Sequence, residues 1–101
     1  MKEKGCIEII TFNLVDNLEE QQISEGFKIL DRFYKKFDGY YGMDIAKVEQ
    51  GQWTLVLRWE SKQLEKNASA NMMKSDETNQ FKMLVNPKTV VKNVYSCVDI
   101  N

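Results

Sequence analysis

Asn13 is the side chain whose type and setting best suit it to act on a ligand. It lies in a run of β-branched and apolar residues, positions 6–15, that is typical of a buried strand. Its amide can donate a hydrogen bond to a substrate oxygen or to bound dioxygen, which makes Asn13 our candidate catalytic residue. The alternative is an amide satisfied by the backbone at the end of the strand, because buried polar groups normally have partners.

Two tryptophans could stack on a flat aromatic ligand. Trp53 and Trp59 have the same parity within residues 51–61, so both lie on one face of the strand predicted there. The alternative is that this row belongs to the hydrophobic core. Tyrosine hydroxyls are further candidates for acid groups. The commoner alternative is a structural tyrosine whose hydroxyl lies in water. The predicted pocket-lining set is Tyr34, Trp53, Trp59, Met72, Phe81 and Tyr95.

The composition excludes several kinds of chemistry. The chain has 101 residues, two cysteines and no histidine, so the usual zinc site, the usual haem axial ligand and the commonest general base are all missing. We therefore predict no metal and no cofactor. Cys6 and Cys97 are expected to lie close together as thiols, because the first and last strands should be antiparallel neighbours.

Charge and hydropathy limit which binding partners and which location we expect. The net charge is −1, whereas nucleic-acid-binding domains usually carry a basic surface, so no nucleic acid is expected. No run of 18 apolar residues occurs, so no membrane span is expected. The first residues read as the start of a strand and not as a signal peptide, so we expect a cytoplasmic protein.

The remaining elements follow from hydrophobic periodicity. Residues 18–37 have an apolar stripe at helical spacing, with acids early and bases late. Residues 40–49 and 53–59 are two strands joined by a tight turn at Gln50 and Gly51. Residues 61–74 form a helix capped by Ser61, a short third helix covers about residues 76–84, and residues 89–100 form the last strand.

This order is β-α-β-β-α-β with a broken second helix. We predict one α+β domain, residues 1–101, with a ferredoxin-like antiparallel sheet in the order 4-1-3-2 and the helices on one face. The first and third strands are the most apolar, which suits the two central positions. Several strands are apolar on both faces, yet two helices cover only one. We therefore expect a homodimer that packs through the open sheet face.

The chain resembles the antibiotic-biosynthesis-monooxygenase family of dimeric α+β barrel proteins. The resemblance covers nearly the whole chain and is carried by Asn13, Gly39, the run at residues 57–61, the break at Ser75-Asp76 with Phe81, and Asn86-Pro87. It implies one pocket per subunit between the sheet and the helices. Haem-degrading members use a strand-one asparagine, a tryptophan and a histidine; only Asn13 matches, so haem degradation is disfavoured.

Two functions remain open. The first is a cofactor-independent monooxygenase-like enzyme acting on a small aromatic or quinol-type substrate. The alternative is a non-catalytic homodimer that binds a small apolar or aromatic molecule or has a stress-related role. A pocket lined by more than one buried polar group would favour the enzyme.

Overall fold

The computed structural model describes residues 1–100, apart from the side chain of Gln50. Its main elements follow the predicted order. They are β1 (Lys2–Asn13), α1 (Glu20–Tyr34), β2 (Tyr40–Lys47), β3 (Gln52–Trp59), α2 (Lys62–Lys74), α3 (Asn79–Lys82) and β4 (Val91–Asp99). Three short 3-10 turns join them, η1 (Glu49–Gly51), η2 (Asp76–Thr78) and η3 (Pro87–Thr89).

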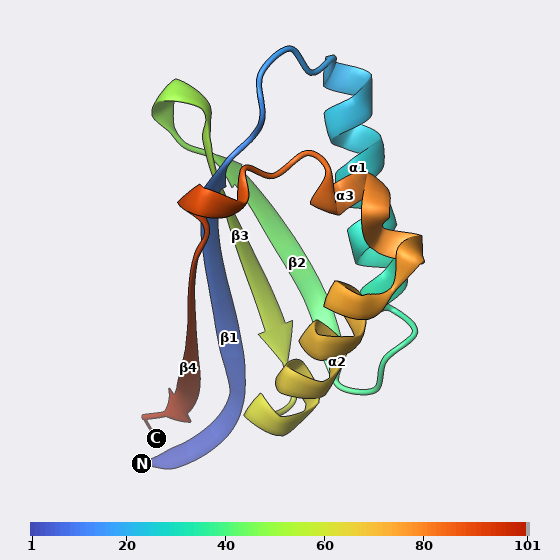
Figure 1. Ribbon diagram of the computed structural model, residues 1–101. Helices are drawn as coiled ribbons and strands as arrows, with labels where there is room; N and C mark the ends of the chain where they lie inside the picture. Colours follow the sequence, from blue (N-terminus) through green and yellow to red (C-terminus); the bar gives the residue numbers. More distant parts are fainter. Residues whose placement is uncertain (101) are drawn as a thin grey trace.

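The sheet has the order β2-β3-β1-β4, and every neighbouring pair is antiparallel. The predicted ferredoxin-like fold is therefore confirmed, with β1 and β3 in the centre. Figure 1 shows α1, α2 and α3 on the same side of this sheet and the two chain ends side by side. The register agrees, since Lys2 pairs with Asp99.

Strand parity decides which side chains face the helices. In β3 the row that was predicted to share one face is the inward one, and Leu55, Leu57 and Trp59 are buried. In β1 the inward row is Cys6, Glu8, Ile10 and Phe12, because Cys6 is opposite Trp59 and Phe12 is opposite Trp53. The core lies between these rows and the inner face of α1, where Phe27, Leu30, Phe33 and Tyr34 are buried.

The helices differ from the prediction at their ends. The stripe predicted a helix over residues 18–37, but α1 begins after a capping box in which the Glu19 amide donates to the Gln22 side chain at 2.8 Å. α1 ends at Tyr34. The Phe37 amide then donates to the Tyr34 carbonyl at 2.9 Å, and this bond between residues three apart marks a tighter turn than an α-helix. Ser61 caps α2 as predicted and accepts from the Leu64 amide at 3.2 Å.

The predicted break after α2 is present. The Ser75 side chain accepts from the Glu77 amide, which starts η2. The third helix is much shorter than residues 76–84, because its first turn is the 3-10 segment and only α3 is α-helical. The hairpin between β2 and β3 likewise contains η1 where a two-residue turn was predicted.

The sheet face opposite the helices has no covering layer within the described chain. Its residues include half-buried Ile7, Ile9 and Val56 and the exposed Val91 and Tyr95. Tyr95 pairs with Ile7, and Val56 pairs with Ile9, so these side chains share one face. This is the apolar face that motivated the predicted homodimer.

Cys6 and Cys97 are both free thiols. Cys6 is opposite Ser96 in the register, so Cys97 lies one residue away from direct pairing. Consecutive strand residues point to opposite faces, so the closeness of the two thiols stays a prediction. Burial raises the pKa of the Cys6 thiol, and the nearby Glu65 carboxylate raises it further, which keeps Cys6 protonated and unreactive.

Candidate functional site

Most of the candidate residues pack together under the helices. Tyr34 and Trp59 are buried with their ring centroids 5.1 Å apart, edge to face, and Met72 and Phe81 are also core residues. Trp53 is half-buried against Phe27, at 5.3 Å between centroids. These five lie in the layer between the sheet and the helices, here called the inner layer, and contact with a ligand stays a prediction for each.

Asn13 and Tyr95 lie elsewhere. Asn13 is exposed at the end of β1, where its backbone amide donates to Thr89 Oγ1 at 2.8 Å and its carbonyl accepts from the Asn86 amide at 2.9 Å. Its parity places it on the uncovered sheet face. Tyr95 is on that face too and is 50% exposed. The structure therefore separates both residues from the inner layer, and a catalytic role for Asn13 remains a prediction.

A group of charged and polar side chains lies inside the inner layer, where the sequence analysis placed only apolar residues. Glu8 of β1 is fully buried, and its Oε1 accepts from Trp59 Nε1 at 3.0 Å. Lys92 Nζ of β4 is 3.3 Å from Glu8 Oε2 and 2.7 Å from Glu65 Oε2 of α2. Lys92 also donates to Ser69 Oγ at 3.0 Å.

We call Glu8, Tyr34, Glu65, Ser69 and Lys92 the inner charge cluster. Both contacts of Glu8 are diagonal cross-strand contacts, because Glu8 is opposite Leu57 and Val94, two residues from Trp59 and from Lys92. Glu65 and Ser69 are four residues apart in α2 and so share one helix face. The cluster therefore joins two strands and two helices, and Trp59 adds a contact from β3.

Burial governs the ionisation of the inner charge cluster. It raises the pKa of Glu8, and the ammonium of Lys92 and the bond from Trp59 oppose that rise only in part. Burial lowers the pKa of Lys92, but its contacts with Glu65 and Glu8 outweigh burial, so the pKa is raised. The pKa of the Tyr34 hydroxyl is raised by burial and by the two nearby carboxylates. At neutral pH Tyr34 is therefore a hydrogen-bond donor and Lys92 a cation.

The Tyr34 hydroxyl is fully buried and has no well-aligned hydrogen-bond partner among the described residues. The Ser69 side chain lies close to it and lowers its pKa in part. A buried unpaired polar group costs about 1–3 kcal/mol. Among the described residues, the Oε2 atoms of Glu8 and Glu65 contact only the ammonium of Lys92. These contacts are ion pairs and not well-aligned hydrogen bonds.

A groove of about 450 Å³ runs between α1 and β2 on the same side of the sheet. Its apolar lining includes Phe27, Met43, Ile45 and Trp53, and its polar lining is Glu20, Ser24, Lys28 and Asp31. Tyr40 connects the groove with the inner charge cluster. Its hydroxyl donates to Asp31 Oδ1 at 2.6 Å, and its ring is 5.5 Å from Tyr34 and 5.1 Å from Trp59.

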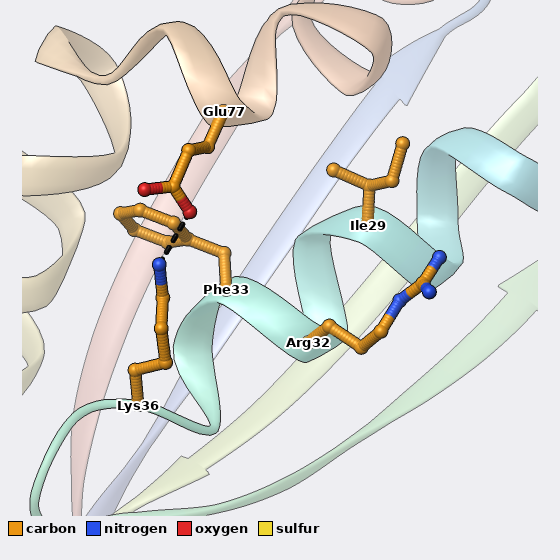
Figure 2. A pocket seen from close by; sticks show the side chains of 5 residues that line it. All are labelled: Ile29, Arg32, Phe33, Lys36 and Glu77. Atoms are coloured by element: carbon orange, nitrogen blue, oxygen red, sulfur yellow. Dashed lines mark hydrogen bonds and ion pairs between the residues drawn. The ribbon is translucent and has the colours of Figure 1, made fainter.

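A second, smaller hollow of about 210 Å³ lies between α1 and η2. Figure 2 shows Lys36 reaching Glu77 across the ring of Phe33, with Ile29 and Arg32 along the helix. The Lys36 and Glu77 side chains are more than half exposed, so this ion pair is worth little. The hollow presents no buried polar group, and we do not assign it a ligand.

Sequence reasoning missed Glu8, Glu65 and Lys92. Lys92 was interpreted as a charged residue that protects an edge strand, and Glu8 and Glu65 were not singled out. A usable signal existed, because Glu8 interrupts a strand predicted to be buried on both faces. Among residues 1–100 there is no group of three or more acidic or cysteine side chains placed to hold a metal ion. None of the described helices is long and apolar enough to cross a membrane.

Comparison with solved structures shows proteins with the same fold. SnoaB from Streptomyces nogalater, described as a cofactor-independent oxygenase, superposes with a TM-score of 0.75 at 9% identity, covering 95% of both chains. A dimeric ferredoxin-like protein from an uncultured marine organism gives 0.63 at 16% identity, covering 96% of this chain and 90% of the other. A Chloroflexus aurantiacus protein, provisionally described as an antibiotic biosynthesis monooxygenase, gives 0.68 at 12% identity, with 96% of both chains covered.

No family model matches the sequence, and no curated protein matches it. The resemblance to the antibiotic-biosynthesis-monooxygenase family is thus confirmed by structure neighbours, at the level of the fold. Identities of 9–16% establish the ferredoxin-like fold and leave the activity to be argued from the site.

Proposed function

We propose that the protein is a cofactor-independent, monooxygenase-like enzyme that acts on a small aromatic or quinol-type molecule. The observation that carries this proposal is the aromatic floor of the groove, which Trp53 and Phe27 form. Tyr40 connects this groove, through its ring contact with Trp59, to the buried carboxyl group of Glu8. An aromatic floor suits a flat ring, because stacked or tilted aromatic pairs add to simple burial. The shared fold with SnoaB supports the proposal but does not carry it.

The chemistry needs a base and dioxygen. Removal of a phenolic proton leaves an electron-rich anion that can reduce dioxygen directly. For naphthol the balance is naphthol plus O₂ giving naphthoquinone plus water: one ring C–H and the O–H are lost, one carbonyl oxygen comes from dioxygen, and the other oxygen leaves as water. The protein would bind and orient the ring and accept the proton, and dioxygen is the oxidant.

The test is oxygen uptake with naphthol and naphthohydroquinone as probes, with quinone formation followed by absorbance. We expect uptake that scales with protein concentration and falls at least tenfold in Trp53→Ala, because the ring loses its stacking partner. Met73→Ala, a change at an exposed apolar residue away from the groove, is the matched control. Uptake no faster than in protein-free buffer would refute the enzymatic proposal.

The groove lining favours a second candidate, a non-catalytic protein that binds a small apolar or aromatic ligand. None of the four polar residues that line the groove is buried: three are exposed and Asp31 is half-buried. A ligand held there would meet Trp53 without meeting an aimed polar group. Quenching of Trp53 fluorescence by naphthol, together with no oxygen uptake, would favour this candidate.

We also propose that the protein is a homodimer formed through the uncovered sheet face. Soluble monomers rarely expose an apolar patch of more than several hundred Å². One neighbour in fold is described as a dimeric ferredoxin-like protein. A face-to-face pair would bury the row that contains Ile9, Val56 and Tyr95, within the roughly 1,200–2,000 Å² of a standard interface. Sedimentation equilibrium measures the mass directly.

A further inference from the structure

We propose that the groove between α1 and β2 binds an aromatic molecule that carries a positively charged amino group. The ring of this ligand packs on Trp53, and its ammonium is drawn by the carboxylate of Glu20. In the free protein the ammonium of Lys47 occupies the face of Trp53 and acts as an internal competitor. This inference rests on the function proposed above, because it names the substrate class of the same groove.

The groove has the volume and the lining that a flat ligand needs. Its volume of about 450 Å³ is within the range of small-molecule sites. Trp53 and Phe27 form its aromatic floor, with ring centroids 5.3 Å apart. Met43 and Ile45 of β2 add an apolar wall. A ligand ring therefore finds both space and apolar contacts in the free protein.

The Trp53 ring already attracts an ammonium. Lys47 is opposite Trp53 in the register of β2 with β3, and its Nζ lies 5.7 Å from the centroid of the Trp53 ring. The π face of a tryptophan is negative and attracts a cation within about 6 Å of its centre. Lys47 forms no ion pair among residues 1–100, so the ring is the group that holds its ammonium. The ammonium of a ligand would be attracted by the same ring.

Lys47 lies at the end of the groove and can leave Trp53 easily. It belongs to the same row of β2 as Met43 and Ile45, because alternate residues of a strand share a face. Its side chain is exposed and has a flexible four-carbon stem. A cation–π contact at an exposed site is weak. A ligand that offers a ring and an ammonium together can therefore displace Lys47.

The charges that line the groove favour a cation. Glu20, Lys28 and Asp31 are the charged lining residues, two acids and one base. Lys28 and Asp31 already have ion-pair partners, Glu25 at 3.9 Å and Lys35 at 2.9 Å. Glu20 is exposed and forms no ion pair within the described part of the chain. Its carboxylate is therefore the charge that a ligand ammonium would compensate.

The test compares three probes that share one ring system and differ in charge: naphthylmethylamine, naphthylmethanol and naphthoate. Binding is followed at about pH 7, under nitrogen, by two-dimensional NMR of isotope-labelled protein. The two indole N–H signals report the place of binding, because Trp53 lines the groove and Trp59 donates to Glu8 in the core. We expect the amine, a cation at this pH, to shift the Trp53 signal and to bind about fivefold more tightly than the alcohol.

Variants that remove one charge separate electrostatic attraction from packing. Lys47→Gln removes the internal competitor and should tighten binding of the amine about threefold. Glu20→Gln removes the attracting carboxylate and should weaken it about threefold. Lys66→Gln and Glu3→Gln make the same changes in net charge at exposed positions of α2 and β1, and neither should alter binding of the amine. High salt should reduce the preference for the amine, because it screens exposed charges.

The outcomes separate this inference from the proposed function. Equal binding of the amine and the alcohol, tighter binding of naphthoate, or weaker binding of the amine by Lys47→Gln would overturn the inference, even if the protein oxidises naphthol. A shift of the Trp59 signal without a shift of the Trp53 signal would overturn it too. A preference for the amine that depends on Glu20, found with no oxygen uptake with naphthol, supports the inference while the monooxygenase proposal fails.

Discussion

Replacing Lys92 with methionine should destabilise the protein in a strongly pH-dependent way. Met keeps the length and apolar character of the lysine stem but removes the ammonium that contacts Glu8 and Glu65. Removing one partner of a buried ion pair costs about 3–5 kcal/mol, since the remaining charge is buried without compensation. Because the Lys92 side chain is 35% exposed, water screens part of the interaction, and we expect about 3 kcal/mol.

The size of this loss depends on the charge of Glu8, whose pKa is raised by burial. At about pH 8 Glu8 is driven to ionise and needs the ammonium, so the full loss should appear. At about pH 4.5, near the unperturbed pKa of glutamate, the raised pKa keeps Glu8 protonated and the loss should be smaller. In a domain of this size about 3 kcal/mol corresponds to a fall in Tm of roughly 12–24 °C.

The assay is urea unfolding at both pH values, at one fixed protein concentration because a dimer would make stability concentration-dependent. Lys88→Met, a change at an exposed lysine just before β4, is the control and should alter stability by less than about 0.5 kcal/mol. The reasoning is wrong if Lys92→Met loses the same free energy at both pH values, or less than about 1 kcal/mol at the higher one.

Three further predictions concern pH, assembly and packing. Because the folded-state pKa of Glu8 is raised, folded protein keeps a proton that unfolded protein loses above about pH 4.3, so stability should decline as pH rises from there through the folded pKa. Glu8→Gln should flatten that decline in urea titrations across pH, whereas an unchanged slope would remove Glu8 as its cause. Wild-type protein at low micromolar concentration should sediment as a dimer, and Val56→Asp, a change on the open sheet face, should sediment as a monomer. Lys66→Asp, a change on the helical side, is the control and should remain a dimer. Wild-type protein that sediments at 11.8 kDa would contradict the dimer. Gly26→Ala should lower the free energy of unfolding in urea by about 1–3 kcal/mol, because an added Cβ would overlap the Leu84 side chain just after α3. Gln21→Ala, at an exposed position of α1, is the control and should leave the stability unchanged. Equal stability of the two variants would show that the contact with Leu84 can relax.

The fold was predictable because its signals are local. Parity put Trp53, Leu55, Leu57 and Trp59 on one face of β3, and in the structure that face is the inward one, with every member except Trp53 buried. Ser61 and Ser75 marked two helix starts and cap them in the structure. Element ends were less certain, since a helical stripe continues into turns such as the one after Tyr34, where the backbone bonds tighten without a change in residue type.

The inner charge cluster was not predictable in the same way. Glu8, Glu65 and Lys92 are far apart in the chain, and their contacts depend on the register of β1 with β4 and on which face of α2 points inward. The sequence interpretation of Lys92 as an edge-strand lysine was correct for its strand, which lies at an edge. It missed that the side chain crosses inward to two carboxyl groups. Asn13 drew attention by its residue type and its apolar neighbours, but its parity in β1 places its side chain on the uncovered sheet face.

The two long helices are held to the sheet by different forces, and this difference makes the packing of α2 the part that depends on pH. The inner face of α1 is largely aromatic and aliphatic, with Phe27, Leu30 and Phe33 buried, so the hydrophobic effect fixes it independently of pH. The inner face of α2 buries Ala68, Met72 and the carboxyl group of Glu65. Burial of that carboxylate is favourable only while Lys92 pairs with it. The Lys92–Glu65 ion pair therefore ties the packing of α2 to the edge strand β4.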